Sequence, residues 1–393
     1  MSRYCYYSLF TYCVLIAGCA EKPASPAIPQ SVPNTPAITS QPGVPGATGA
    51  NADLSIPRLD PKPVIWLADL KEDPPLSAAR AKARQLMSLA DRLKAGGRFE
   101  DAEAKYKESI AADPTWAFPA YQLACNYELW NQPARALPQF TKAMELGFDD
   151  FPSALADEEL GQIRTRPDFN TALQGIRQRY LASSKSRVGQ PVAVRPQGTK
   201  PETGWPMMLL LHGYGDSNLS YLDQAAEWAG QGFLTVAVPG SVPTSDGRFQ
   251  WDMDSTDPTQ RDLQAIVTSP LFNGLVDKDK VFLLGFSQGA LHAMLLTAAH
   301  PNLYAGVVSL SPGGSLSTQL IEPKLNRSER PASVVFIHGT QERHAPLVGI
   351  WSQACQAAGW RFLSKTHPGR HHFPADWEKI QPEIAAFLRN SKP

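Results

Sequence analysis

The sequence predicts an α/β domain with a mostly parallel sheet, preceded by an all-α domain of paired helices. Two observations lead to this prediction. In the C-terminal half, unbroken apolar runs alternate with helix-like stretches, which is typical of strands buried on both faces of a parallel sheet. Before that half, apolar residues recur at spacings of three and four, the period of a helix that buries one face. A chain of 393 residues has room for both domains.

The charge balance argues against a polyanion as the main partner. The chain carries 37 Lys and Arg residues against 37 Asp and Glu residues, so its formal net charge is zero. No strong field therefore attracts nucleic acid or an anionic membrane surface. The hydrophobic content of 43% is sufficient for a sizeable core.

The N-terminus, MSRYCYYSLFTYCVLIAGC, has the layout of a secretory signal. An Arg near the start precedes an apolar stretch that is too short to span a bilayer. The stretch ends in Ile16-Ala17-Gly18-Cys19, which resembles the lipobox of bacterial lipoproteins. The resemblance implies cleavage of residues 1–18 and a diacylglycerol group on the Cys19 thiol. An ordinary signal peptide or an uncleaved anchor is the alternative. We expect a lipid-anchored protein of the bacterial envelope, with the outer membrane favoured because Ala20 is not a retention signal of the Asp type.

Residues 19–75 are predicted to be a tether. Proline, Ala, Ser and Thr without periodicity cannot bury enough apolar surface to offset the ordering of the chain, and the prolines keep it extended. The mature chain would retain Cys19, Cys125 and Cys355. Lipidation uses the first, and the other two lie in different predicted domains, so no disulfide framework is implied.

Residues 76–182 are predicted to form helices in pairs. Leu86, Leu89 and Leu93 share one helical face, and Gly96-Gly97 ends the run. A shift of 34 residues aligns Leu89 with Leu123, Ala102 with Ala136 and Tyr106 with Phe140. This period resembles the tetratricopeptide repeat, which presents a concave surface to a peptide or protein partner. An unrelated bundle of helical hairpins is the alternative, and the third segment matches poorly enough to be a cap.

Residues 183–393 are predicted to form the α/β domain. The expected strands are 206–213, 232–240, 280–287, 304–313 and 332–340. Helix-like stretches lie among them at 256–268, 288–300 and 345–358. In such open sheets the chemistry gathers at the carboxyl ends of the strands.

Gly285-Phe286-Ser287-Gln288-Gly289 is a G-x-S-x-G motif. It follows an expected strand and opens an expected helix, which is the setting of a nucleophile elbow. Such an elbow strains the serine backbone and exposes its hydroxyl above the sheet. Ser287 is therefore the candidate nucleophile.

A serine nucleophile needs a base, and the base needs an acid that orients it; in folds of this type the chain order is Ser, acid, His. No aspartate lies between Ser287 and the C-terminal histidines. Of the glutamates in that interval, Glu322 and Glu329 sit in a polar stretch. Glu342 directly follows the strand that ends in HG and is the candidate acid.

The stretch HPGRHHFPADW, residues 367–377, holds the candidate bases. His371 and His372 lie in a loop before the final helix, where a catalytic histidine belongs, and His367 is expected to end a strand. Adjacent side chains point in different directions, so only one of the pair is expected to face Ser287. We expect His212, His292 and His300 to be structural.

The stretch LLLHGYGDS, residues 209–217, ends the first core strand. Its loop is expected to supply one oxyanion N–H group from Tyr214, which would join the N–H group of Gln288. Residues 247–258 are expected to overhang the site.

Residues from about 205 to 390 resemble the phospholipase/carboxylesterase branch of the α/β-hydrolases. That group has an HG-x-GD loop, a GFSQG elbow, an HG-x-x-D acid turn and a GH-x-(F/W)-P histidine turn. The chain carries the first two intact, at residues 212–216 and 285–289. The acid turn carries Glu342 in place of Asp. Alignment on Phe373-Pro374 favours His371, which we choose, whereas alignment on Pro368-Gly369 favours His372. The resemblance implies ester hydrolysis through an acyl-enzyme, without a metal or an organic cofactor.

The sequence therefore predicts a membrane-tethered serine esterase that acts on a small-molecule, lipid or polysaccharide ester. One alternative is a scaffolding lipoprotein with a degenerate hydrolase domain, and another is a peptidase or polysaccharide deacylase, because fold alone does not separate these activities. Acyl chain length, leaving group and the partner of the repeats are not encoded in any motif we recognise.

Overall fold

The computed structural model describes residues 55–56, 58–71, 76–245, 247–314, 331–342 and 345–390. Cys19, the expected signal peptide and most of the expected tether lie outside these residues. Within the described part of the chain, no helix combines the length and the apolar character that crossing a membrane requires.

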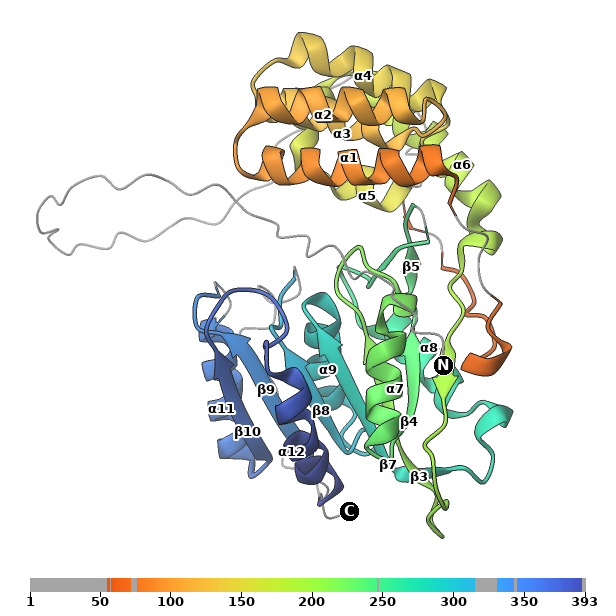
Figure 1. The fold of residues 1–393 in the computed structure, drawn as a ribbon, viewed down its shortest axis with the longest axis vertical. Helices are drawn as coiled ribbons and strands as arrows, with labels where there is room; N and C mark the ends of the chain where they lie inside the picture. Colours follow the sequence, from red (N-terminus) through yellow and green to blue (C-terminus); the bar gives the residue numbers. More distant parts are fainter. Residues whose placement is uncertain are drawn as a thin grey trace, which may run out of the picture.

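The helical part of the chain lies beside one end of the α/β part (Figure 1). Its helices are α1 (Ala78–Ala95), α2 (Phe99–Ala112), α3 (Phe118–Leu129), α4 (Pro133–Glu145), α5 (Phe151–Ala156) and α6 (Phe169–Arg187). Tyr106 of α2 and Phe140 of α4 are both buried at the core positions that the 34-residue shift aligns. The same step separates the first residues of these two helices, Phe99 and Pro133. Helix α6 continues to Arg187, five residues past the expected boundary at 182.

The segment after α4 is irregular. Helix α5 ends at Ala156, and the 3-10 helix η2 (Glu158–Thr165) contains Gly161 with φ 46° and ψ −116°. Residues with a side chain rarely adopt this backbone conformation, so the kink favours glycine, and Glu128 of α3 packs against it. The kink interrupts η2, so this segment lacks the long regular helices of α1 to α4.

The α/β part is built on one sheet in the order β1-β2-β4-β3-β7-β8-β9-β10. Neighbouring strands are parallel except β2 and β4, so the sheet is mostly parallel, as expected. The strands are β1 (Ile65–Trp66), β2 (Val192–Val194), β3 (Trp205–Leu211), β4 (Leu234–Val238), β7 (Val276–Phe286), β8 (Gly306–Leu310), β9 (Ser333–Gly339) and β10 (Arg361–His367). The five expected strands correspond to β3, β4, β7, β8 and β9.

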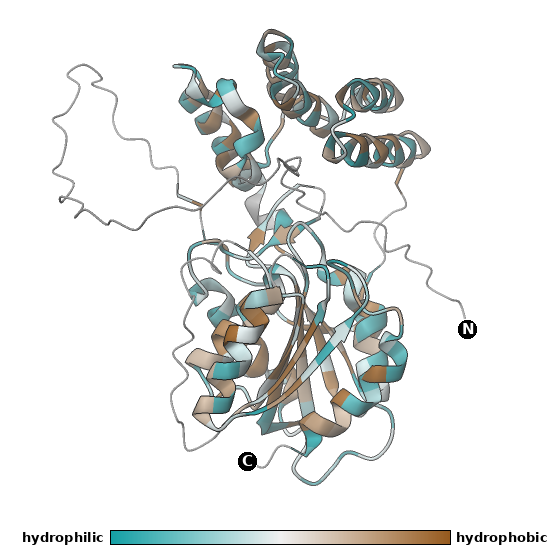
Figure 2. Cartoon of the chain, turned by 90° about the vertical axis from the view of Figure 1, so that its left-hand side faces the viewer, coloured by the Kyte–Doolittle hydropathy of each residue, from teal (hydrophilic) through white to brown (hydrophobic). Residues whose placement is uncertain are grey.

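Helices cover both faces of this sheet, and their apolar sides meet the apolar strands (Figure 2). Helices α8 (Asp257–Val267), α9 (Gln288–Ala299) and α11 (Ala345–Ala358) bury their apolar residues in the core on one face. Helices α7 (Leu222–Gly230) and α12 (Trp377–Arg389) pack in a second core on the other face. The 3-10 helices η1 (Leu67–Asp69), η3 (Asn218–Tyr221) and η4 (Pro270–Phe272) lie in the connections.

A short piece of the expected tether belongs to the sheet. Ile65 and Trp66 form strand β1, which pairs in parallel with Val192 and Ala193 of β2. The Arg195 guanidinium lies 4.5 Å from the centre of a Trp66 ring. The apolar segment 63–70 thus docks on the α/β domain.

Candidate active site

Ser287 stands at a sharp corner between β7 and α9. Strand β7 ends at Phe286 and helix α9 begins at Gln288, with Ser287 between them at φ 56° and ψ −119°. A positive φ is unfavourable for a residue with a side chain, so the turn holds Ser287 in a strained conformation. The corner has the geometry of a nucleophile elbow, as the motif predicts.

The two glycines of the motif are required by close contacts. A Cβ on Gly285 would lie 2.3 Å from the carbonyl oxygen of Gly289, and a Cβ on Gly289 would lie 2.4 Å from the carbonyl oxygens of Leu211 and His212. These contacts are with backbone atoms, which cannot move aside as a flexible side chain does. The helix therefore approaches strands β7 and β3 closely only because both positions lack a side chain.

The structure places His371 against Ser287. His371 follows strand β10, and its Nε2 atom lies 2.8 Å from Ser287 Oγ, within hydrogen-bonding distance. Its ring lies 4.9 Å from the ring of Phe286. Phe286 in turn lies 5.1 Å from the ring of Phe373, so the aromatic ring beside the imidazole is itself packed against a second one.

His372 faces away from Ser287. Its Nδ1 atom donates to the carbonyl oxygen of Phe373 at 2.7 Å, and its ring lies 4.8 Å from that of His367. His367 ends strand β10, as expected. Of the two adjacent histidines, His371 is the one whose ring lies within hydrogen-bonding distance of Ser287.

Glu342 completes the chain of contacts. Its Oε2 atom lies 3.3 Å from His371 Nδ1, and its side chain is only 3% exposed. Its Oε1 atom accepts hydrogen bonds of 2.6 Å from the Ser311 hydroxyl and from the Gly339 N–H group. Glu322 and Glu329 lie outside the described residues.

The hydrogen bonds keep Glu342 charged. Burial by itself would raise the pKa of this carboxyl, but bonds from His371, Ser311 and the Gly339 N–H group outweigh burial and lower it below its usual value. Because the folded form has the lower pKa, these bonds stabilise the fold above the pKa of the unfolded chain. This contribution is lost as the pH falls through the folded pKa.

Ser311 is a residue that the sequence analysis missed. It follows strand β8, is buried, and has φ 50°, so the turn after β8 is strained where the hydroxyl meets Glu342. A small polar residue at the carboxyl end of the strand next to β7 is the signal that could have found it.

Replacing Glu342 by Gln should lower kcat for ester substrates by about 100-fold or more, because the neutral amide no longer stabilises a protonated His371. The matched variant is Glu342→Asp, which keeps the charge and shortens the side chain by one methylene. Steady-state kinetics should rank wild type first, Glu342→Asp second and Glu342→Gln last. A Glu342→Gln enzyme that keeps the wild-type kcat would exclude Glu342 from the site.

The loop after β3 passes beside Ser287. A Cβ on Gly213 would lie 3.5 Å from the Cβ atom of Ser287, so the loop approaches the nucleophile at Gly213. Tyr214 is the residue that follows Gly213 in this loop. Gln288 is the first residue of α9, and its N–H group therefore has no acceptor within the helix. The N–H groups of Tyr214 and Gln288 are thus the candidates for holding a developing oxyanion near Ser287 Oγ.

His212 stabilises the loop after β3 by hydrogen bonds to backbone atoms. The ring is fully buried, and its Nε2 atom accepts a 2.9 Å hydrogen bond from the Gly240 N–H group. Its Nδ1 atom therefore carries the proton and donates to the Gly213 carbonyl oxygen at 2.7 Å. Burial lowers the pKa of His212, which favours this neutral form. The ring braces the loop, in line with the structural role expected for it.

Trp251 is part of the segment expected to overhang the site, but it is fully buried. Its N–H group donates to Gln288 Oε1 at 3.0 Å, and its carbonyl oxygen accepts from Gln288 Nε2 at 2.9 Å. Its indole N–H group donates to the His212 carbonyl oxygen at 2.7 Å. Trp251 is therefore hydrogen-bonded to Gln288 and to His212, which begins the loop that carries Tyr214.

The remaining candidates have structural surroundings. His292 of α9 is buried between Thr259 Oγ1 and the Asp252 carbonyl oxygen, each 3.0 Å away, and burial lowers its pKa to about 4. Cys125 and Cys355 are both buried free thiols. His300 immediately follows α9.

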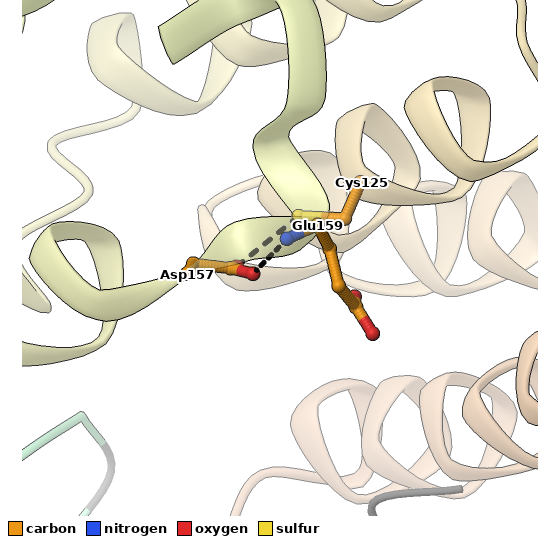
Figure 3. A group of neighbouring side chains, drawn as sticks. All are labelled: Cys125, Asp157 and Glu159. Carbon is orange, nitrogen blue, oxygen red and sulfur yellow. Dashed lines mark hydrogen bonds between the residues drawn. The ribbon is translucent and has the colours of Figure 1, made fainter. Parts of the chain in front are cut away.

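Cys125, Asp157 and Glu159 bring potential metal-ligand atoms together in the helical domain (Figure 3). The Cys125 thiol lies 3.4 Å from Asp157 Oδ2, and burial raises its pKa well above the usual value, which keeps it protonated. The Lys94 ammonium donates to Glu159 and, at 2.9 Å, to Gln122. Because the Lys94 ammonium already pairs with Glu159 and the Cys125 thiol is protonated, we assign this cluster to the packing of the helices.

The fold and the chemistry of these side chains define the class of protein to which the α/β part is similar. A mostly parallel sheet covered by helices, with a strained serine after β7, an acid after β9 and a histidine after β10, is an α/β-hydrolase fold. Residues 240–371 match the model of the phospholipase/carboxylesterase family, which supports a hydrolase of the esterase type. The matched range includes Ser287, Glu342 and His371 and begins after the candidate oxyanion loop.

Individual proteins are similar to parts of this chain. The chain is 30% identical over 209 residues to "Putative esterase NocK" of Nocardia uniformis subsp. tsuyamanensis, which covers 51% of this chain and 57% of that protein. It is 25% identical over 91 residues to a chloroplastic protein of Arabidopsis thaliana, which covers 22% of this chain and 27% of that protein. The chain thus spans little more than half the length of the first relative. The crystal structure of the Bacillus cereus carboxylesterase has 18% identity and a TM-score of 0.42, covering 53% of this chain and 98% of the other.

Proposed function

We propose that this protein is a serine hydrolase that cleaves carboxylic ester bonds through an acyl-enzyme. The observation that supports the proposal most directly is the line of contacts from Ser287 Oγ to His371 Nε2, and from His371 Nδ1 to Glu342 Oε2. A hydroxyl, an imidazole and a buried carboxylate in this order suit nucleophilic acyl transfer. The name of the Nocardia relative, a putative esterase, points to the same substrate class, a small-molecule ester.

In the proposed mechanism, His371 Nε2 takes the proton of Ser287 Oγ while this oxygen attacks the ester carbonyl. The N–H groups of Tyr214 and Gln288 stabilise the negative charge on the carbonyl oxygen of the tetrahedral intermediate. The C–O bond to the alcohol then breaks, and His371 gives its proton to the departing oxygen. His371 next takes a proton from water, which attacks the acyl-serine, and the carboxylic acid is released as Ser287 regains its hydrogen.

A p-nitrophenyl ester tests this mechanism. Mixing excess ester with the protein should release a burst of about one equivalent of p-nitrophenolate per protein, followed by a slower steady rate, because an acyl-enzyme accumulates. Rapid-mixing absorbance measures the burst, and a series of acyl chain lengths then identifies the preferred ester. Folded protein that shows neither burst nor turnover with any ester of the series would refute the proposal.

Two other functions are separated by related measurements. A scaffolding protein with a degenerate hydrolase domain would be inert toward a fluorophosphonate, which labels activated serines. A peptidase or a deacylase of polysaccharide would be labelled, but would turn over amide or glycan-linked acyl substrates faster than simple esters. The compact contact between Ser287 and His371 favours the esterase over the degenerate scaffold.

We further propose that the Cys19 thiol carries lipid and holds the protein at the bacterial envelope, with the outer membrane favoured, and that the helical part binds a protein or peptide partner as a tetratricopeptide-like array. The lipobox-like residues 16–19 support the first idea, and the 34-residue step between α2 and α4 supports the second. Metabolic labelling with an alkynyl fatty acid tests the anchor. Label that persists after Cys19→Ser would place the lipid elsewhere.

A further inference from the structure

The helical domain contacts a small hairpin of the α/β domain, formed by β5 (Val242–Pro243) and β6 (Phe249–Gln250). The Tyr180 hydroxyl of α6 donates a buried 3.0 Å hydrogen bond to the Pro243 carbonyl oxygen. Arg187, also of α6, donates to the Thr244 carbonyl oxygen at 3.2 Å. The hairpin therefore receives two hydrogen bonds from the last helix of the helical domain.

A buried carboxylate adds a third contact. Asp150, which precedes α5, is only 2% exposed. Its Oδ2 atom accepts from the Ser245 N–H group of the hairpin at 3.2 Å, while its Oδ1 atom accepts from the Ser153 N–H group at the start of α5 at 3.2 Å. One side chain thus links the first turn of a helix in the helical domain to the tip of the hairpin.

The other strand of the same hairpin holds the candidate oxyanion loop. The Phe249 N–H group donates to the Asp216 carbonyl oxygen at 2.8 Å, and the Phe249 carbonyl oxygen accepts from the Gly215 N–H group at 3.0 Å. The Arg248 guanidinium donates to the Gly215 carbonyl oxygen at 3.2 Å. Both residues that follow Tyr214 are therefore fixed to the hairpin by backbone hydrogen bonds.

The loop needs support of this kind. Tyr214 lies between Gly213 and Gly215, and Gly215 has φ 67°, so the local sequence does little to restrict the backbone. Stabilisation of an oxyanion requires donors that are already in position, since a shift of a few tenths of an ångström weakens the interaction. The helical domain thus contacts the hairpin that holds the oxyanion loop.

We propose that the helical domain positions the oxyanion loop through the hairpin, and that Tyr180 is a positioning residue for ester hydrolysis. This inference rests on the proposed function, because it assigns the Tyr214 N–H group to the oxyanion. It gives the helical domain a role in catalysis in addition to any partner that it binds, and it makes the hairpin the route by which such a partner would alter the activity.

The test compares two buried tyrosines of the helical domain in the full chain. Tyr180→Phe removes the hydrogen bond to Pro243 and keeps the ring. Tyr106→Phe removes a hydroxyl that donates to Asp91 at 2.6 Å within the helical domain, far from the hairpin in the chain, and serves as the matched control. Arg187→Lys is a second variant, which keeps a positive charge beside Asp149 and loses the guanidinium contact with Thr244.

We expect Tyr180→Phe to lower kcat and kcat/KM equally, by about 10-fold, with KM unchanged, because an interaction made in the transition state is weakened rather than removed. The inhibition constant of an alkyl boronic acid, which forms a tetrahedral adduct on serine, should rise by the same factor. Arg187→Lys should change these quantities in the same direction. Tyr106→Phe should leave all three quantities at their wild-type values, even if it lowers the unfolding temperature.

The possible results separate a failure of the proposed function from a failure of the positioning role of Tyr180. Wild-type protein that a fluorophosphonate does not label refutes the proposed function, and this inference with it. If the wild type is labelled but Tyr180→Phe keeps the wild-type kcat and boronate affinity, the inference alone is wrong. Equal losses in Tyr180→Phe and Tyr106→Phe would also overturn it, because the effect would then come from general loosening of the helical domain.

Discussion

Ser287→Ala is expected to abolish ester hydrolysis and labelling by a fluorophosphonate. The change removes the oxygen that lies 2.8 Å from His371 Nε2 at the strained turn, while the Cβ atom and the backbone of the turn are retained. Loss of the nucleophile in a serine hydrolase lowers kcat by about a million-fold, so only the background rate should remain. Gel fluorescence after labelling and the release of p-nitrophenolate measure the two effects.

Ser186→Ala is the control for this experiment. Ser186 is an exposed residue of α6 whose hydroxyl donates to the Ser183 carbonyl oxygen, so its loss should change neither labelling nor turnover. Circular dichroism should show equal folding of wild type and both variants. Labelling that survives in Ser287→Ala would mean that a different nucleophile reacts, and the assignment of Ser287 would be wrong.

His371→Ala should have the second-largest effect, with kcat falling by about 10 000-fold or more, because Ser287 then lacks a base to accept its proton. The adjacent histidine provides a control in the same turn. His372→Ala removes an exposed ring that bonds to the Phe373 carbonyl oxygen and should keep kcat within about 3-fold of wild type, as expected for a surface change.

The pair of histidine variants tests the direction of each side chain. Steady-state kinetics on both proteins, with unfolding temperatures as a check on folding, give a clear comparison. A large loss in His372→Ala together with high activity in His371→Ala would reverse the assignment. Such a result would require the turn after β10 to rearrange when substrate binds.

Much of the α/β domain was predictable because its signals are local. Unbroken apolar runs indicated β3, β4, β7, β8 and β9, and the structure has each of these strands in a mostly parallel sheet. The G-x-S-x-G motif indicated the corner at Ser287. Its two glycines are needed because a Cβ at either position would clash with backbone atoms, which lie a few residues away for Gly285 and at the end of the adjacent strand for Gly289. The irregular segment of α5 and η2 was not predictable, because its kink at Gly161 packs against Glu128 of α3, which is distant in the sequence.

Some residues of the candidate site were predictable from the sequence, and others were found only in the structure. Chain order and position after a strand selected Ser287 and Glu342, and narrowed the base to His371 or His372. The choice between these histidines depends on the direction of the turn after β10 and on the aromatic rings behind it. Ser311 and Tyr180 carried no motif. Each is recognised only by the residue it contacts, which lies 31 or 63 positions away in the chain.

By itself, the sequence determined which apolar segments become the central strands, where the chain turns sharply at a serine, and which side chains are chemically able to act there. Each of these properties follows from neighbouring residues, through steric limits on the backbone and the burial of apolar side chains. Only the tertiary structure decided which imidazole lies beside the serine, and that a helix before the α/β domain donates hydrogen bonds to the hairpin next to the candidate oxyanion loop. Contacts between residues far apart in the chain depend on how whole layers pack, and no local pattern carries that information.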